Sequence, residues 1–152
     1  MAKIINAKKK FFGTDGIRGP ISSKTSPDFI LKLGWAAGEV FKDLGIKTFI
    51  IGKDTRISGY MLEAALQAGI ISSGLNVRLV GPLPTPAISY LVSTFKSQAG
   101  IVISASHNSY EDNGIKFFDD KGQKISDEIE LLIEQKISEE ITVAVSYTHL
   151  RA

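Results

Sequence analysis

With 152 residues, 43% of them hydrophobic and 22% charged, the chain has the length of one domain and the composition of a globular protein rather than a disordered one. The net charge of +2 is too small to indicate a nucleic-acid partner, so we interpret the three lysines at 8–10 as a solvated N-terminal stretch. The absence of cysteine excludes disulfides and thiol chemistry, and the lack of an apolar run of ~18 residues or a secretory signal predicts a cytoplasmic protein with no membrane partner.

The first half of the chain predicts a helix, a strand and a second helix. Ser26, Pro27 and Asp28 form a helix start, and apolar residues at helical spacing continue the helix to Asp43. Residues 48–51 are apolar and nearly continuous, which favours a buried strand. The second helix is predicted at 58–73, with an apolar stripe that comprises Met61, Leu62, Ala65, Leu66 and Ile70.

The second half continues this alternation and then departs from it. We predict a strand at 77–80, a helix at 85–95 and a strand at 100–103. Residues 115–118 follow with no helix between, so we expect an antiparallel neighbouring strand. The last helix is predicted at 126–140, and its shared apolar face comprises Ile129, Leu132, Ile133 and Ile137.

The alternation of strands and helices predicts an α/β fold, a three-layer α/β/α sandwich with a mixed, mostly parallel sheet. The three strands between helices are nearly continuous apolar runs, so we expect helices on both faces of each. Ligands of such sheets lie beyond the carboxyl ends of the parallel strands. Polar clusters fall at those ends and before the first helix, at residues 52–56, 81–85, 104–108 and 13–19.

The polar stretch after the third strand permits several interpretations. Ser106 and His107 are adjacent, and adjacent residues usually project in different directions, so we disfavour a hydrolase pair. A histidine metal site is also disfavoured, because the only other histidine is the distant His149. When the stretch is considered alone, a polar turn in which Asn108 and Asn113 make local hydrogen bonds is the safer interpretation.

Four stretches together closely resemble the first domain of the α-D-phosphohexomutase family, and they occur in the family's order. They are Phe12–Gly19, Gly52–Gly59, Gly81–Pro86 and Ser104–Asn108. Within that family, the first and last of them are most similar to the phosphoglucosamine mutase branch. The resemblance predicts an N-terminal extension at 1–10, the domain at 11–140 and a linker or off-family tail at 141–152.

The resemblance implies a phosphoryl-transfer site in the loop after the third strand. Ser106 would carry a phosphoryl group between O6 and O1 of a hexose phosphate, through a bisphosphate intermediate. His107 and Asn108 would surround this group, and Arg18 and Thr14 would bind phosphate. Mg²⁺ would be bound through the phosphoryl group of Ser106, with a hexosamine 1,6-bisphosphate as activator.

Lys116, Arg56 and Lys53 keep two interpretations each. The resemblance makes Lys116 a general acid/base candidate, although burial or cationic neighbours would be needed for a lysine to act as a base; the alternative is a solvated strand lysine. Arg56 and Lys53 are either phosphate contacts or members of an ion-pair cluster with Asp54. We therefore leave Arg56, Lys53 and Asp54 outside the catalytic set.

The chain departs from the family in two ways. Ser109 stands where the family usually has proline, which removes a fixed φ but no chemistry. The family's remaining domains, with an Asp-x-Asp-x-Arg magnesium loop, have no counterpart here, so we expect this chain alone to be inactive. The predicted partners are a phosphosugar, the remaining domains of a parent enzyme and a second full-length copy in a homodimer. The alternatives are a phosphomannomutase or phosphoglucomutase domain and a non-catalytic phosphosugar-binding module.

Overall fold

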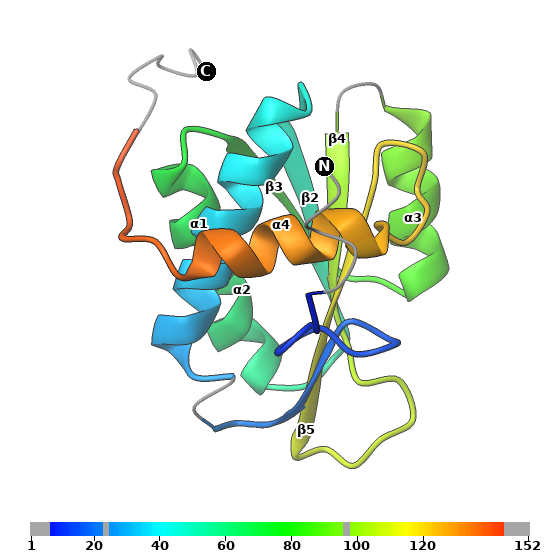
Figure 1. Ribbon diagram of the computed structural model, residues 1–152. Coiled ribbons are helices and arrows are strands. Elements are labelled where there is room, and N and C mark those ends of the chain that lie inside the picture. The colour runs from blue at the N-terminus through cyan, green and yellow to red at the C-terminus, as the bar shows by residue number, and fades with distance from the viewer. Residues whose placement is uncertain (1–6, 23–24, 96–97, 145–152) are drawn as a thin grey trace.

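The structure, a computed structural model, describes residues 7–22, 25–95 and 98–144. His149 and most of the predicted tail lie outside these ranges. The elements labelled in Figure 1 are, in chain order, β1 (Ile17–Pro20), α1 (Pro27–Asp43), β2 (Thr48–Lys53), α2 (Ser58–Ser72), β3 (Asn76–Pro82), α3 (Thr85–Thr94), β4 (Gln98–Ile103), β5 (Asp112–Phe118) and α4 (Asp127–Ile137).

The strands form one sheet in the order β1-β5-β4-β2-β3. β2 pairs in parallel with both β3 and β4, whereas β5 pairs antiparallel with β4 and with β1. Four of the five strands therefore run in one direction, and β5 runs against them. This confirms the predicted mixed, mostly parallel sheet and the antiparallel strand at 115–118. β1 was not predicted, because it lies in the glycine-rich segment that we interpreted as a loop.

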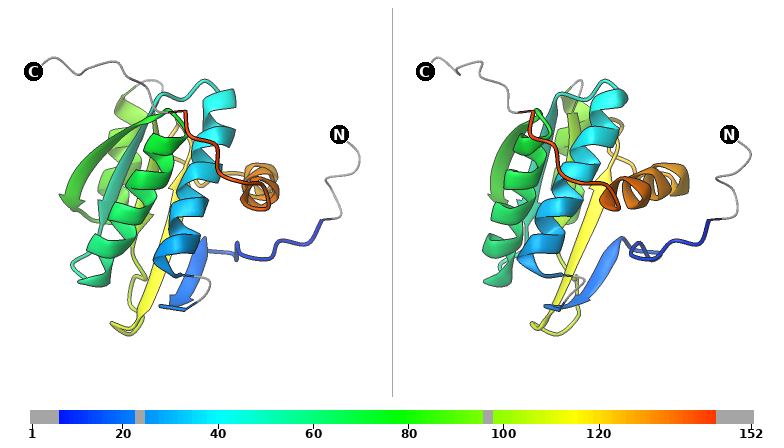
Figure 2. Two further views of the ribbon diagram at one scale, coloured as in Figure 1. Left: turned by 90° about the vertical axis from the view of Figure 1, so that its left-hand side faces the viewer. Right: turned by 60° about the vertical axis from the view of Figure 1, so that its left-hand side comes forward.

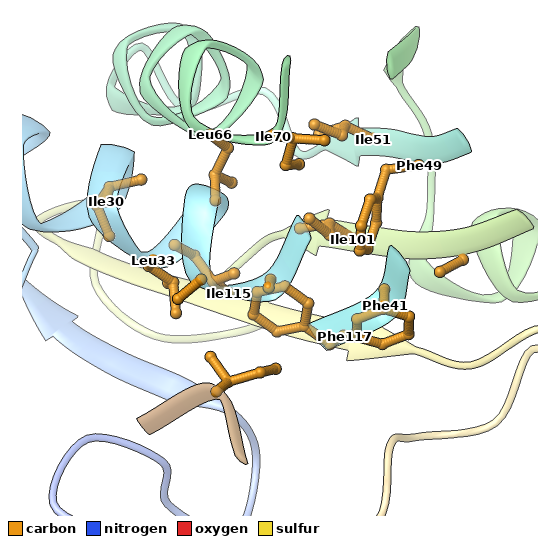
Figure 3. Packing of buried hydrophobic residues seen from close by; sticks show 14 of the residues in the cluster. Ile30, Leu33, Phe41, Phe49, Ile51, Leu66, Ile70, Ile101, Ile115 and Phe117 are labelled. Atoms are coloured by element: carbon orange, nitrogen blue, oxygen red, sulfur yellow. The ribbon is translucent and has the colours of Figure 1, made fainter. Parts of the chain in front are cut away.

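Helices cover both faces of the sheet, but unequally (Figure 2). The larger core cluster lies on one face, where α1, α2 and α4 contribute Leu33, Leu66 and Ile133. Figure 3 shows side chains of α1 and α2 meeting Phe49, Ile101 and Phe117 from three neighbouring strands. The smaller cluster lies on the opposite face, and its members are Ile50, Ile88, Val92, Val102 and Phe118. The helix on this second face is α3.

Two helices begin at the caps that the sequence predicted. The Ser26 hydroxyl accepts a hydrogen bond from the backbone N–H of Phe29, with Pro27 opening α1. The Ser126 hydroxyl accepts one from Ile129 at the start of α4. α4 ends at Ile137, three residues before the predicted limit. No helix in the described ranges combines the length and the apolar character that crossing a membrane requires.

Three expectations about burial were wrong. β3 is not covered on both faces, because it is an edge strand and α3 packs on β2 and β4 instead; Leu79 is 44% exposed. Met61 and Leu132 are each 37% exposed, so they lie at the margins of their apolar stripes. Lys9 is not a solvated lysine, because its ammonium group forms ion pairs with Asp127 and the fully buried Glu130.

Candidate functional site

The loop between β4 and β5 leaves the sheet at the edge where the parallel strands end, at the bottom of Figure 1. Ser106 in this loop has φ of +54°, the only positive φ among the described non-glycine residues. The Ser104 hydroxyl accepts a hydrogen bond from the Ser106 N–H (3.1 Å), and the Ala105 carbonyl accepts one from the Asn108 N–H (3.1 Å). Ala105 is buried and Ser106 is exposed, so this tight turn presents the Ser106 hydroxyl to solvent.

Gly114 on β5 allows the start of this loop to lie against the sheet. Its carbonyl accepts a hydrogen bond from the Ser104 N–H (2.8 Å). A Cβ atom at Gly114 would stand under 3.0 Å from the Ser104 carbonyl oxygen. Arg18 on β1 is the direct partner of Gly114, and Lys116 lies two residues further along β5, so all three share one face. The loop therefore begins over the face of the sheet that carries Arg18 and Lys116.

Arg18 is half-buried and has hydrogen-bonding capacity to spare. Its Nε atom is buried and makes no hydrogen bond within the described part of the chain. One terminal nitrogen, Nη2, lies 3.9 Å from a carboxylate oxygen of the exposed Asp15. A buried guanidinium N–H without an acceptor is costly, and an anionic ligand would satisfy it.

Lys116 is half-buried and lines a pocket of about 210 Å³. The pocket lies beside β5, and its other lining residues are Asp15, Gly16, Thr85, Phe117, Phe118, Lys124 and Glu130. Lys124, a second cation, donates to the Thr14 carbonyl oxygen at 2.8 Å. Lys116 is thus neither fully solvated nor isolated from charge, and its acid/base role stays a prediction.

The charged residues after β2 form ion pairs. Arg56 pairs with Asp54, and its Nη2 also donates to the Asn108 carbonyl (2.8 Å) and more weakly to the Ser106 carbonyl (3.5 Å). Lys53 is buried and donates to both carboxylate oxygens of Glu63 at 2.9 Å. The partner of Lys53 is therefore Glu63 rather than its neighbour Asp54. The one signal for Glu63 in the sequence is a carboxylate inside an apolar helix.

A second polar cluster was missed altogether, and it joins the N-terminal segment to α4. Lys9 bridges Asp127 and Glu130, at 2.8 and 2.6 Å. These hydrogen bonds raise the pKa of Lys9, the Asp127 bond most, and the same contact lowers the pKa of Asp127. The Glu134 carboxylate accepts from the backbone N–H groups of residues 10–12. The spacing of these acids along one helix face was the available signal.

The other predicted site residues, Thr14, His107 and Asn108, are all exposed. His107 is exposed in the loop. The Asn108 side chain donates to Asp112 at 3.2 Å, and exposed Thr14 uses its carbonyl to accept from Lys124. The structure thus gathers the Ser106 loop, Arg18 and Lys116 at one part of the sheet, while the catalytic and binding roles predicted for these residues stay predictions.

The sequence of this chain matches that of a known protein family. The family model "Phosphoglucomutase/phosphomannomutase, alpha/beta/alpha domain I" matches residues 9–144. The chain belongs to this family. The match reaches Ala144, whose N–H donates to the Ser72 carbonyl at the end of α2, while the predicted domain limits of 11 and 140 stay a prediction.

Individual relatives sharpen the assignment. The phosphoglucosamine mutase of Vibrio atlanticus is 59% identical over 138 residues, which are 90% of this chain and 31% of that protein. The phosphoglucosamine mutase of Psychromonas ingrahamii is 63% identical over 135 residues, 88% of this chain and 30% of that protein. A putative phosphomannomutase from Thermus thermophilus superposes with a TM-score of 0.79 at 33% identity, over 93% of this chain and 32% of that one. The chain thus spans less than a third of these relatives' length, and the predicted resemblance is confirmed.

Proposed function

We propose that this chain is the first domain of a phosphoglucosamine mutase, and that Ser106 carries the phosphoryl group. The observation that carries the proposal is the left-handed turn that exposes Ser106 at the end of β4, over the face with Arg18 and Lys116. The parent reaction would interconvert glucosamine 6-phosphate and glucosamine 1-phosphate. Because the chain covers 31% of its Vibrio relative, this activity would belong to a longer protein.

The chemistry is a transfer of one phosphoryl group in each direction. A sugar hydroxyl oxygen attacks the phosphorus of phosphorylated Ser106, and the bond to the serine oxygen breaks as the bond to the sugar forms. The hydroxyl proton passes to a base, for which Lys116 is the candidate. The resulting bisphosphate turns round, and the serine oxygen attacks the phosphorus of the other phosphoryl group. The bond from that phosphorus to the sugar oxygen breaks, and the sugar oxygen takes the proton back from the same base. Positioning and charge stabilisation dominate such reactions, which is the role that we assign to Arg18.

The Mg²⁺ ion that the family resemblance implies does not fit a site made by the described residues alone. No three acidic or histidine side chains gather within them. The carboxylates beside the loop, Asp54 and Asp112, already accept from Arg56 and Asn108. Mg²⁺ normally needs octahedral oxygen ligands. The phosphoryl group of Ser106 therefore stays the one Mg²⁺ ligand that is predicted from this domain.

One observation separates this proposal from the phosphomannomutase alternative. Identity to the phosphoglucosamine mutases is 59–63%, against 33% to the Thermus phosphomannomutase homologue, which supports an amino-sugar substrate. The 1,6-bisphosphate activator, the homodimer of the longer protein and its cytoplasmic location stay predictions of the family resemblance.

The test is to locate the phosphoryl group. The full-length protein would be incubated with hexose 1,6-bisphosphate labelled in its phosphates, then digested and mapped by mass spectrometry. We expect the label on Ser106, its loss in Ser106→Ala, and its retention in the control Ser109→Ala. Label on Ser104 or Ser109 would refute the assignment, and a chain that takes no label at all would favour the non-catalytic module.

A further inference from the structure

Arg56 joins two loops that follow neighbouring parallel strands. From the end of β2, its Nη2 reaches the carbonyl oxygens of Asn108 (2.8 Å) and Ser106 (3.5 Å), fifty or more residues away in the sequence. Asp54 holds the other side of the guanidinium by an ion pair with Nη1, and its carboxylate also accepts from the Arg56 backbone N–H at 3.1 Å. The Asp54 N–H in turn donates to Ile103, the last residue of β4, at 2.9 Å. The arginine is therefore fixed to the neighbouring ends of β2 and β4.

The Ser106 loop needs such support. A left-handed conformation is unfavourable for a serine and persists only where the surroundings impose it. The residues from Ser106 to Glu111 are all exposed, so burial does not hold them. The hydrogen bonds to Ser106 N–H and Asn108 N–H come from within the loop itself. Arg56 acts from outside this loop, in the connection between β2 and α2, and it binds the carbonyl groups on both sides of His107.

We propose that Arg56 is a positioning residue, which holds the backbone of the loop and so the conformation of Ser106. The link to catalysis rests on the proposed function of Ser106. The geometry favours this role over phosphate binding, because three of the five N–H donors of a guanidinium are directed at protein acceptors, from Nη1 to Asp54 and from Nη2 to the two loop carbonyls. A planar guanidinium can serve a carboxylate and two carbonyls at once, whereas the single ammonium group of a lysine cannot reproduce that arrangement.

Amide hydrogen exchange on the 152-residue chain tests the positioning role without any assay of activity. We would compare Arg56→Lys and Arg56→Ala with the wild-type chain, and use Arg78→Lys on the exposed edge strand β3 as the matched control. In both Arg56 variants the amide hydrogens of Ser106 and Asn108 should exchange roughly tenfold faster than in the wild-type chain, because hydrogen bonds from a charged donor to the loop are lost. The amide of Ile101 within β4 should exchange at the wild-type rate in all of them.

Three outcomes would overturn the proposal. Wild-type loop exchange in Arg56→Lys would mean that charge alone suffices, and unchanged exchange in both variants would mean that Arg56 does not hold the loop. Acceleration at Ile101 equal to that in the loop would indicate a general loss of stability. If Arg56→Ala does not fold, Arg56→Lys carries the comparison alone.

Steady-state kinetics then test the link to catalysis in the full-length enzyme. Because Arg56 contacts the loop and not the substrate, Arg56→Lys should lower kcat about tenfold or more and leave KM within about twofold. A raised KM with unchanged kcat would instead make Arg56 a substrate ligand and overturn the proposal. If Ser106 takes no phosphoryl label, the proposed function fails, while the exchange result still decides whether Arg56 holds the loop.

Discussion

The two faces of the sheet are built for different purposes. On the first, α1 and α2 approach so closely that a Cβ atom on Gly69 would stand under 3.0 Å from the Leu31 carbonyl oxygen. A Cβ atom on Gly34 would also stand under 3.0 Å from the Leu66 carbonyl oxygen. On the second, α3 covers β2 and β4. The rest of that face, over β5 and β1, carries the half-buried Arg18 and Lys116.

One small domain can therefore use one face of its sheet for stability and leave the other for the chemistry that we propose. The first face buries most of the apolar side chains, and burial of apolar surface is the main source of folding free energy. The second face is only partly covered, which leaves Arg18 and Lys116 half-buried and the Ser106 loop exposed where we propose that the phosphosugar binds. We therefore expect the stability of the domain to be divided unequally between the two faces.

The largest loss of stability should come from truncating a buried isoleucine, and its size should depend on the face of the sheet. Ile70 and Ile88 are both fully buried. Ile70 lies in the cluster of the first face and Ile88 in the smaller cluster of the second. Truncation of a buried isoleucine to alanine costs about 2–5 kcal/mol, and the cost is greatest where the surroundings cannot close the cavity. We expect Ile70→Ala to lower the free energy of unfolding by about 4 kcal/mol and Ile88→Ala by about 2 kcal/mol.

Urea denaturation followed by circular dichroism would measure both losses, with Leu79→Ala on exposed β3 as the control that changes little. Equal losses for the two isoleucines would show that the second face is packed as rigidly as the first. A larger loss for Ile88→Ala would reverse the comparison.

Much of this fold could be predicted because periodicity and capping are local signals. The Ser26-Pro27 and Ser126 caps appear where the sequence placed them, and the apolar runs of β2 and β4 are buried as expected. β3 has the same kind of apolar run but lies at the edge of the sheet. Strand order depends on which strands pair across the whole chain, and no local pattern encodes it.

The candidate site shows the same limit. The Ser106 loop was predicted because it follows a buried strand and resembles a family motif. The partners that fix the charged groups were missed, since Glu63 meets Lys53 and Glu130 meets Lys9 only after the chain has folded. The sequence left Arg56 either as a phosphate contact or as an ion-pair partner of Asp54. The structure shows the ion pair and the bond to the Asn108 carbonyl, which joins segments that are distant in the sequence.

A smaller loss of stability should follow from disturbing the contact between the second face and the Ser106 loop. In a strand interior, replacing glycine by alanine normally gains about 0.5–1 kcal/mol. Gly114→Ala should instead destabilise by about 1–2 kcal/mol, because the new Cβ would meet the Ser104 backbone, which no rotamer change can move aside. Gly13→Ala is the control, since its Cβ would have ordinary contact at 3.5 Å. If Gly114→Ala is as stable as the wild-type chain under urea denaturation, the loop does not lie as closely on β5 as described.

The smallest effect should come from the polar margin of the first face, where Lys9 joins the N-terminal segment to α4. Lys9→Met removes the ammonium group shared by Asp127 and Glu130 but leaves Glu130 with Lys124 at 3.4 Å, so the loss should be smaller than for Gly114→Ala. The difference between wild-type and variant should also depend on pH. Asp127 has a lowered pKa because of Lys9, so its share of the stability is full above the ordinary aspartate value of about 3.9 and is lost as the pH falls through the lowered pKa.

The raised pKa of Lys9 works in the opposite direction, since its contribution is full below the ordinary lysine value of about 10.4 and is lost as the pH rises through the raised pKa. The free energies of unfolding of wild-type and Lys9→Met should therefore differ by a constant amount between about pH 5 and 9, and converge towards acid pH. The exposed neighbour Lys8 supplies the control, because Lys8→Met removes the same charge without this contact. If Lys8→Met and Lys9→Met lose the same stability at every pH, net charge explains the loss, and the N-terminal segment is not held to α4 by Lys9.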